Sequence, residues 1–139
     1  MEFCQETYAS YIEPVENLHP GFADKLLEDF RRYKQTQCDD LPEYFRRDVP
    51  YGSPPSVAGW LHHIHLCIPP RKFNKKQAQL YRTCSKKNDV ALVYAQNKYD
   101  LHRYKIIGVL APDAHAKARC NDTMSYLGRV AQKFHNSFL

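Results

Sequence analysis

The chain has 139 residues, of which 43% are hydrophobic and 25% are charged, and its formal net charge is +5. This length predicts one domain over residues 1–139, with enough chain to bury a sizeable core. No apolar run approaches the roughly 20 residues that a membrane-spanning helix needs. The N-terminus is acidic and lacks the order of a signal peptide. We therefore expect a cytoplasmic protein with no membrane partner.

Charge is distributed unevenly along the chain. Residues 1–50 contain 6 Lys or Arg and 11 Asp or Glu, whereas residues 51–139 contain 14 Lys or Arg and 4 Asp or Glu. Seven of these basic residues lie between positions 71 and 87, where no acid occurs. Such a stretch suits a polyanionic partner, because binding releases condensed counterions. A solvated basic loop is the common alternative.

In the first half of the chain, the pattern predicts one clear helix. Residues 5–13 give a weak strand pattern, and residues 19–35 form an amphipathic helix with Pro20 at its first position. Residues 38–56 read as a turn-rich connector with one helical turn at 42–47. The apolar stripe of the predicted helix consists of Phe22, Leu26, Phe30 and Tyr33.

The second half of the chain is predicted to supply most of the sheet. Residues 60–68 read as a strand, and residues 90–96 and 103–111 as an antiparallel hairpin with a short polar link. A short helix is expected near 74–80 and a loop or single helical turn at 112–119. A final helix begins near Asn121 or Asp122 and carries a stripe of apolar residues: Met124, Leu127, Ala131, Phe134 and Phe138. These elements predict an α+β domain.

The stretch WLHHIHLC, residues 60–67, is the most informative for chemistry. Successive side chains of a strand point to opposite faces, so His63 and His65 share one face and lie about 7 Å apart. Ile64 and Leu66 share the other face, which we expect to be the core face. The two imidazoles are therefore expected to project away from the core.

Three kinds of chemistry are compatible with this histidine pair. His63 and His65 could supply two zinc ligands with His115 or Cys67 as a third, although no acid lies close in sequence and no cysteine has ligand spacing. A nucleotide cofactor is disfavoured, because the chain has neither GxGxxG nor GxxxxGK[ST]. Metal-free cleavage of RNA fits better, because it needs a base, an acid and cations that stabilise the phosphorane. A surface role for either histidine remains the plainer alternative.

For RNA cleavage, the basic part of the chain offers groups of each required type. His63, His65 and His115 can transfer protons near neutral pH. Arg82, Lys117 and Arg119 can stabilise phosphate charge, and Tyr94 can stack on a base or form a hydrogen bond. In an apolar strand, however, Tyr94 is more often a core residue.

Six pieces of sequence, in this order and spacing, resemble the YafO family of type II toxins. They are LPEYFRRD (41–48), HIHL (63–66), YRT (81–83), DVALVY (89–94), IIGVLAPDAHAKAR (106–119) and MSYLGRVAQKF (124–134). The resemblance runs from about residue 22 to the end. It departs from the family in the loop TCSKKND, which is longer than expected, and in the first 15 or so residues, which match poorly.

The resemblance implies a RelE/ParE-like fold, with helices on one side of a small antiparallel sheet, in a single toxin domain. It implies a ribosome-dependent mRNA endonuclease that inhibits translation, with mRNA, the ribosome and a cognate YafN-type antitoxin as partners. The matching polar positions are His63, His65, Arg82, Asp89, Tyr94, His115 and Arg119.

The sequence therefore predicts a metal-independent mRNA endonuclease that needs no cofactor. The expected catalytic residues are His63, His65, Arg82 and His115. The expected RNA-binding residues are Lys75, Lys76, Lys86, Lys87, Asp89, Tyr94, Lys117 and Arg119. Two alternatives stay open: a non-catalytic basic domain that binds RNA or a protein partner, and a zinc enzyme built on the HxH pair.

Overall fold

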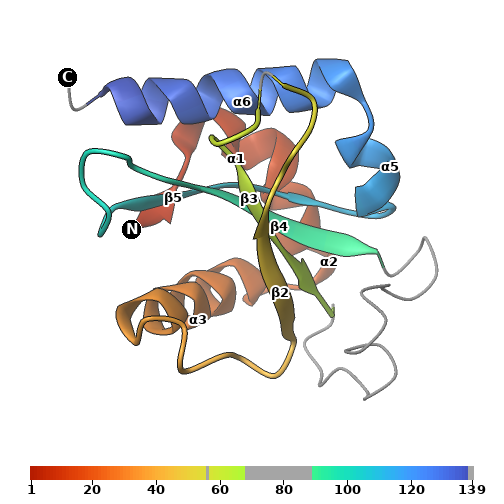
Figure 1. The fold of residues 1–139 in the computed structure, drawn as a ribbon. Helices are drawn as coiled ribbons and strands as arrows, with labels where there is room; N and C mark the ends of the chain where they lie inside the picture. The colour runs from red at the N-terminus through yellow and green to blue at the C-terminus, as the bar shows by residue number, and fades with distance from the viewer. Residues whose placement is uncertain (56, 68–88, 138–139) are drawn as a thin grey trace.

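A five-stranded sheet forms the centre of the protein (Figure 1). The structure is a computed structural model that describes residues 1–55, 57–67 and 89–137. The strands lie in the order β1-β5-β4-β3-β2. Their bounds are β1 Glu2–Phe3, β2 Phe45–Pro50, β3 His62–Leu66, β4 Val90–Gln96 and β5 Tyr104–Leu110. β1 pairs with β5 in parallel and the other neighbours are antiparallel, so the sheet is mixed.

The predicted strand at 60–68 and the hairpin of 90–96 with 103–111 are confirmed as β3, β4 and β5. β4 and β5 pair along their length, from Ala91 with Leu110 to Gln96 with Tyr104. Nearly every residue of these two strands is buried, which explains why their sequences are apolar on both faces.

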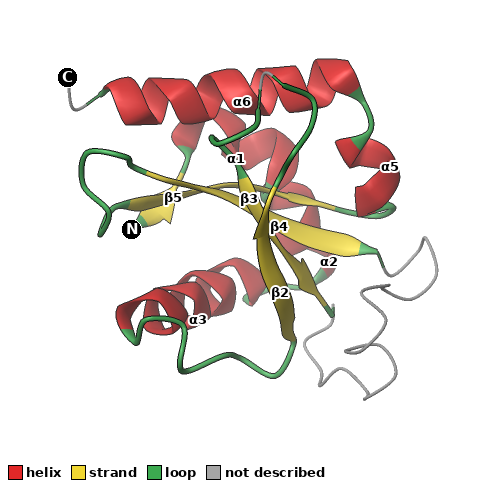
Figure 2. Ribbon diagram, in the orientation of Figure 1, coloured by secondary structure: helices red, strands yellow, loops and turns green. Residues whose placement is uncertain are grey.

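Helices cover both faces of this sheet (Figure 2). α3 (Phe22–Gln35) packs on one face and α6 (Asn121–Asn136) on the other, and each forms a separate apolar core with the strands. The α3 core includes Phe30, Ile64 and Leu92, whereas the α6 core includes Val93 and Leu127. The α+β class is confirmed, but the expected packing of helices on one side of an antiparallel sheet is wrong.

The N-terminus forms helices where a strand was expected. Residues 5–13 are mostly α1 (Gln5–Tyr11), followed by α2 (Glu13–Leu18), and only the two residues of β1 are extended. Thr7 lies in α1, and its hydroxyl donates to the carbonyl of Ile107. A Cβ on Gly108 would lie 2.6 Å from the Cβ of Tyr11, so glycine there lets α1 lie directly against β5.

In the stretch expected to form a helical turn, 42–47, the amide of Phe45 donates to the carbonyl of Pro42 at 2.9 Å and closes a turn, but the chain then continues as a strand. This strand is β2, which pairs with β3 and has an irregularity between Phe45 and Asp48. Arg46 and Arg47 lie in that irregularity, so the run has no strict alternation for the sequence to reveal.

The longer helices follow their predicted stripes. Phe22, Leu26, Phe30 and Tyr33 of α3 are buried, and so are Met124, Leu127, Ala131 and Phe134 of α6. α3 begins at Phe22 after Gly21, whose φ of 88° suits glycine, so Pro20 precedes the helix and is not part of it.

The turn predicted at 112–119 is a short helix, α5 (Ala114–Ala118). The helix expected near 74–80 and the last stripe residue, Phe138, lie outside the described residues. No helix in the described part of the chain has the length and apolar character needed to cross a membrane.

Candidate active site

Three histidines and one aspartate meet where the end of β3, the start of β4 and the first turn of α5 come together. His63 and His65 lie on β3, Asp89 directly precedes β4, and His115 lies in α5. The amide of Ala114 donates to the carbonyl of Asp89 at 3.0 Å, which ties α5 to the start of β4. We call these four residues the histidine cluster.

Asp89 fixes the position of His115. The carboxylate is 4% exposed, and its Oδ2 accepts hydrogen bonds from the backbone amide of His115 at 2.8 Å and from its ring Nδ1 at 2.7 Å. A carboxylate only accepts, so Nδ1 carries the proton and Nε2 is left for another partner. The His115 side chain is 50% exposed, which leaves its ring within reach of a ligand.

His65 stacks on His115 and approaches the same carboxylate. The two ring centroids lie 4.9 Å apart with an angle of 17° between the planes, and His65 Nδ1 lies 3.8 Å from Asp89 Oδ1. Burial lowers the pKa of His65, and the positive charge of His115 and of Arg46 lowers it further, against the opposing effect of Asp89. His65 is therefore neutral at neutral pH and able to accept a proton.

His63 extends the row of rings away from His115. Its ring meets that of His65 edge to face at 5.3 Å and stacks on Tyr51 at 4.0 Å. Burial, followed by the charges of His65 and His115, lowers the pKa of His63 to about 4. Its Nδ1 is buried with no hydrogen-bond partner among the described residues.

The surroundings of these rings differ from the open face that the sequence suggested. α6 covers part of the same sheet face, and His65 is only 9% exposed, so the cluster lies at the margin of the α6 core. The reason is again that β4 and β5 are apolar on both faces and need two covering layers. The face assignment itself is confirmed, because Ile64 and Leu66 belong to the α3 core.

Tyr94 is not part of the histidine cluster. It is 2% exposed and lies on the α3 face, where its hydroxyl donates to Asp48 and accepts from Lys34 Nζ at 2.8 Å. Asp48 also binds Lys34 at 2.7 Å. The structure places Tyr94 outside the histidine cluster, because the strand alternation turns the ring into the opposite core, and its contact with RNA stays a prediction.

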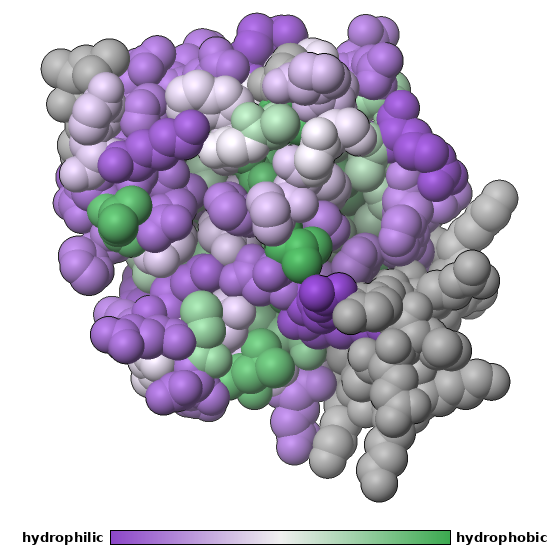
Figure 3. Space-filling view, viewed as in Figure 1, coloured by the Kyte–Doolittle hydropathy of each residue, from purple (hydrophilic) through white to green (hydrophobic). Residues whose placement is uncertain are grey.

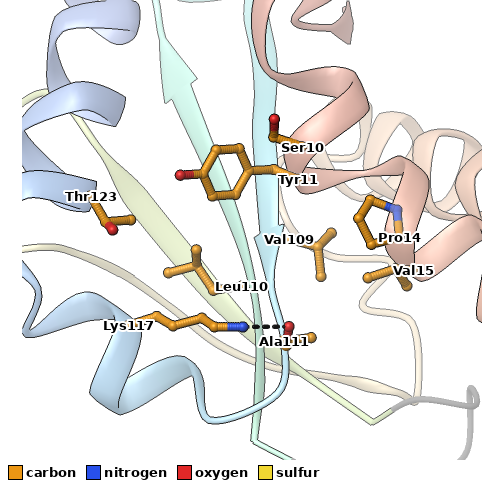
Figure 4. Close-up of a pocket in the computed structure, with 9 residues that line it drawn as sticks. All are labelled: Ser10, Tyr11, Pro14, Val15, Val109, Leu110, Ala111, Lys117 and Thr123. Atoms are coloured by element: carbon orange, nitrogen blue, oxygen red, sulfur yellow. Dashed lines mark hydrogen bonds between the residues drawn. The ribbon is translucent and has the colours of Figure 1, made fainter.

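Lys117 also points away from the cluster. Its Nζ donates to the carbonyl of Ala111 at 2.6 Å, beside a cavity of about 190 Å³ that is lined by α1, α2, β5 and α6 residues such as Tyr11 and Val109 (Figure 4). Arg119 is exposed at the end of α5, four positions after His115 and so on the same side of that helix.

Five predicted residues lie outside the described residues: Lys75, Lys76, Arg82, Lys86 and Lys87. The described chain stops at Cys67, just after β3, and resumes at Asp89 of the histidine cluster. Among the described residues, no group of three or more His, Cys, Asp or Glu is arranged to hold a metal ion.

The sequence did not reveal three features of the site. Tyr51 follows Pro50 and reaches His63 because its amide donates to Leu61, a long-range contact with no local signal. Arg46 is buried beside His65 through the β2 irregularity. Asp89 was expected to contact RNA, but its carboxylate is buried and binds histidine.

The arrangement offers one group that can accept a proton and a second group that can donate one. One imidazole is kept neutral by burial, and the other is oriented by a carboxylate, with their rings in contact. Two such groups are what general base and general acid catalysis require.

A family model described as Toxin YafO, type II toxin-antitoxin system, matches residues 31–136. The mRNA interferase toxin YafO of Escherichia coli (strain K12) is 34% identical over 120 residues, covering 83% of this chain and 86% of that protein. No solved structure matches the chain. The chain therefore belongs to the YafO family of type II toxin-antitoxin systems, as its sequence predicted.

Proposed function

We propose that the protein is the toxin of a type II toxin-antitoxin system and cleaves mRNA by metal-independent transesterification. The observation that carries the chemistry is the contact of His115 with Asp89 at 2.7 Å while its ring stacks on His65. Family membership supports the activity, because the Escherichia coli relative is named an mRNA interferase.

In the proposed reaction, neutral His65 accepts the proton of a ribose 2′-hydroxyl. The 2′-oxygen then attacks the adjacent phosphorus, and the bond from phosphorus to the 5′-oxygen breaks. His115 acts in its doubly protonated form: Asp89 holds Nδ1–H, and Nε2 delivers its proton to the leaving 5′-oxygen, which leaves His115 neutral and His65 protonated. The products are a 2′,3′-cyclic phosphate and a free 5′-hydroxyl, so atoms and charge balance. His63 is the second candidate for the base, because its pKa is also lowered.

Cations are needed where negative charge develops on the phosphorane. We infer that Arg82 and Arg119 supply them. Arg82 lies seven positions before Asp89 in the chain, and Arg119 lies one helical turn from His115. Lys117 is less suited, because its ammonium already binds Ala111.

The proposed partners follow from the same family. We infer that the ribosome presents the mRNA and that an antitoxin of the YafN type neutralises the toxin by direct contact, both in the cytoplasm. We also infer a RelE/ParE-like toxin fold, although with helices on both faces of the sheet.

The test combines growth with mapped RNA ends. Expression of the wild type should arrest growth and create new 5′ ends in mRNA, and purified protein should create them only when ribosomes are present. His65→Ala, His115→Ala and Arg82→Ala should each abolish the arrest while remaining folded. If these variants and His63→Ala are all fully toxic, the site is wrong. Arrest without new RNA ends would favour a non-catalytic RNA-binding protein.

A further inference from the structure

A second group of aromatic rings lies at the other end of β4, where the β4–β5 turn meets the end of α6. Tyr99 stacks on His135 with the ring centroids 4.6 Å apart and the planes at 19°. Trp60 meets the edge of His135 at 5.0 Å, and Lys98 Nζ lies 4.0 Å from the centre of the Trp60 ring. We call these four residues the ring platform.

The turn that carries Tyr99 is held firmly in place. The buried side-chain amide of Asn97 donates to the carbonyls of Phe134 and His135, and its oxygen accepts from the amides of Tyr99 at 2.8 Å and Asp100 at 3.0 Å. The amide of Lys98 donates to His135 Nδ1 at 3.3 Å. These contacts order the ring before any ligand arrives, so binding costs little additional ordering.

Tyr99 presents an open aromatic face. Its side chain is 63% exposed although its inner side rests on His135. Proteins often bind single-stranded nucleic acid through an exposed aromatic ring with cations nearby. The ring stacks on a base, and the cations attract the phosphates. The turn and its flanks, residues 97–105, contain Lys98, Arg103 and Lys105 but only one acid, Asp100.

A large protein-binding surface is less consistent with these observations. The face of the molecule that Figure 3 shows is mostly hydrophilic, with apolar side chains in separate spots. Near the platform, the exposed large hydrophobic residues in the described chain are Tyr99 and Leu101, which fall short of an extended apolar patch.

We propose that the ring platform binds an unpaired RNA base by stacking on Tyr99, as a second RNA contact separate from the histidine cluster. The proposal rests on the proposed function for the presence of RNA. Asn97 lies six positions along the chain from Ala91, the β4 partner of His65, so the two sites are about 20 Å apart. One single-stranded segment can reach both, since a single OB-fold that binds single strands covers about 4–16 nucleotides.

Trp60 is the only tryptophan of the chain, so its fluorescence reports on the platform directly. We would titrate the full chain carrying His115→Ala with an oligoadenylate of about ten nucleotides, following Trp60 emission and the anisotropy of labelled RNA. RNA should change the emission, and Tyr99→Leu should raise the Kd by roughly tenfold or more. Tyr99→Phe should bind like the parent, because it keeps the ring. Tyr126→Leu, in α6, is the matched control and should have no effect.

The proposal is overturned if Tyr99→Leu binds RNA as tightly as Tyr99→Phe, or if anisotropy reports binding while Trp60 emission stays constant. A Tyr99→Leu variant that binds RNA normally but loses a purified antitoxin would make the platform a protein surface instead. Neither readout requires cleavage. A wild type that responds at Trp60 but cuts no RNA would therefore contradict the proposed function and leave the platform standing.

Discussion

Asp89 has two roles that only a buried carboxylate can combine. Its Oδ2 holds the backbone and the ring of His115, while its Oδ1 faces His65 at 3.8 Å. The two imidazoles are stacked, and the buried negative charge that faces Nδ1 of each ring offsets the repulsion that arises when both rings are protonated. We therefore propose that Asp89 is a positioning residue for the proposed acid.

Replacing Asp89 by Asn tests this role. The amide keeps the shape of the carboxylate but removes the charge that faces a protonated His115. We expect the cleavage rate to fall by about 10²-fold, in the range typical of acid and base groups. The kcat should change much more than the KM, because RNA contacts elsewhere are untouched. Single-turnover and steady-state cleavage on ribosomes would measure both.

Asp113→Asn is the matched control for Asp89→Asn. Asp113 has a φ of 56°, which asparagine tolerates, and it makes no side-chain capping bond. Asp113 lies two positions before His115, at the start of α5. Its substitution by Asn therefore also removes one negative charge near His115. Equal loss of activity in both variants would mean that Asp89 acts through general charge, not through its contact with His115.

His63 should make the fold sensitive to acid. Its pKa is lowered to about 4 in the folded protein against about 6.5 when unfolded, so the unfolded chain binds more protons between these values. The contribution to stability is fully present above about pH 6.5 and is lost as the pH falls toward 4. The expected loss is on the order of 1–3 kcal/mol for this residue alone.

His63→Phe should reduce this pH dependence, because phenylalanine keeps the stacking on Tyr51 and cannot be protonated. Urea unfolding at pH 7.5 and pH 4.5 gives the two free energies of unfolding to compare. The difference should shrink but not vanish, since burial also lowers the pKa values of His62 and His65. An unchanged difference, equal to that of the exposed His102→Phe control, would contradict the role assigned to His63.

At the scale of elements, the α3 face of the sheet contains a polar cluster that serves stability. Lys34, Asp48 and Tyr94 bind one another beneath α3, and Tyr33 also donates to Asp48 at 3.0 Å. Burial and the Asp48 carboxylate raise the pKa of Tyr94, so its hydroxyl remains a donor. The cluster joins α3 to β2 and β4, on the opposite side of the sheet from the histidines.

Tyr94→Phe separates this structural role from RNA binding. Removing the hydroxyl leaves Lys34 and Asp48 with one partner fewer, so we expect a loss of about 1–2 kcal/mol in the free energy of unfolding. The cleavage rate of the folded variant should equal that of the wild type. Chemical denaturation and a cleavage assay below the unfolding temperature measure the two effects. A large loss of cleavage without a loss of stability would instead support a direct contact between Tyr94 and RNA.

The elements that the sequence predicted well are those whose pattern comes from local burial. The stripe of α3 and the apolar runs of β4 and β5 are fixed by which side chains face a core. α1 and β2 were missed because their conformation depends on distant partners. Thr7 bonds to Ile107, and β2 is extended because it pairs with β3 across an irregular register at Arg46. Neither contact produces a regular pattern of apolar residues in α1 or β2 from which the element could be predicted.

For the whole molecule, the sheet brings together residues that are far apart in the sequence, from His63 to His115. The strand period placed His63 and His65 on one face, His115 was already a candidate from the basic part of the chain, and the resemblance added Asp89. Only the tertiary structure shows that the end of β3, the start of β4 and the first turn of α5 meet at the same place, so that Asp89 binds His115. The opposite placement of Tyr94 also follows from strand alternation, once β4 is known to pair in register with β3.

Lys75 and Lys76 belong to the basic run of the sequence between β3 and β4. The described chain stops before this run at Cys67 and resumes after it at Asp89 of the histidine cluster. If Lys75 and Lys76 contact phosphates, replacing both by Gln removes two counterion-release contacts. The slope of log K against log salt for binding single-stranded RNA should then become shallower by about 1.4, at roughly 0.7 per contact. A matched double variant, Lys25→Gln with Arg31→Gln, removes the same charge from α3. Equal changes in both variants would show that net charge alone drives binding. A change confined to Lys75 and Lys76 would locate the polyanion beside the histidines.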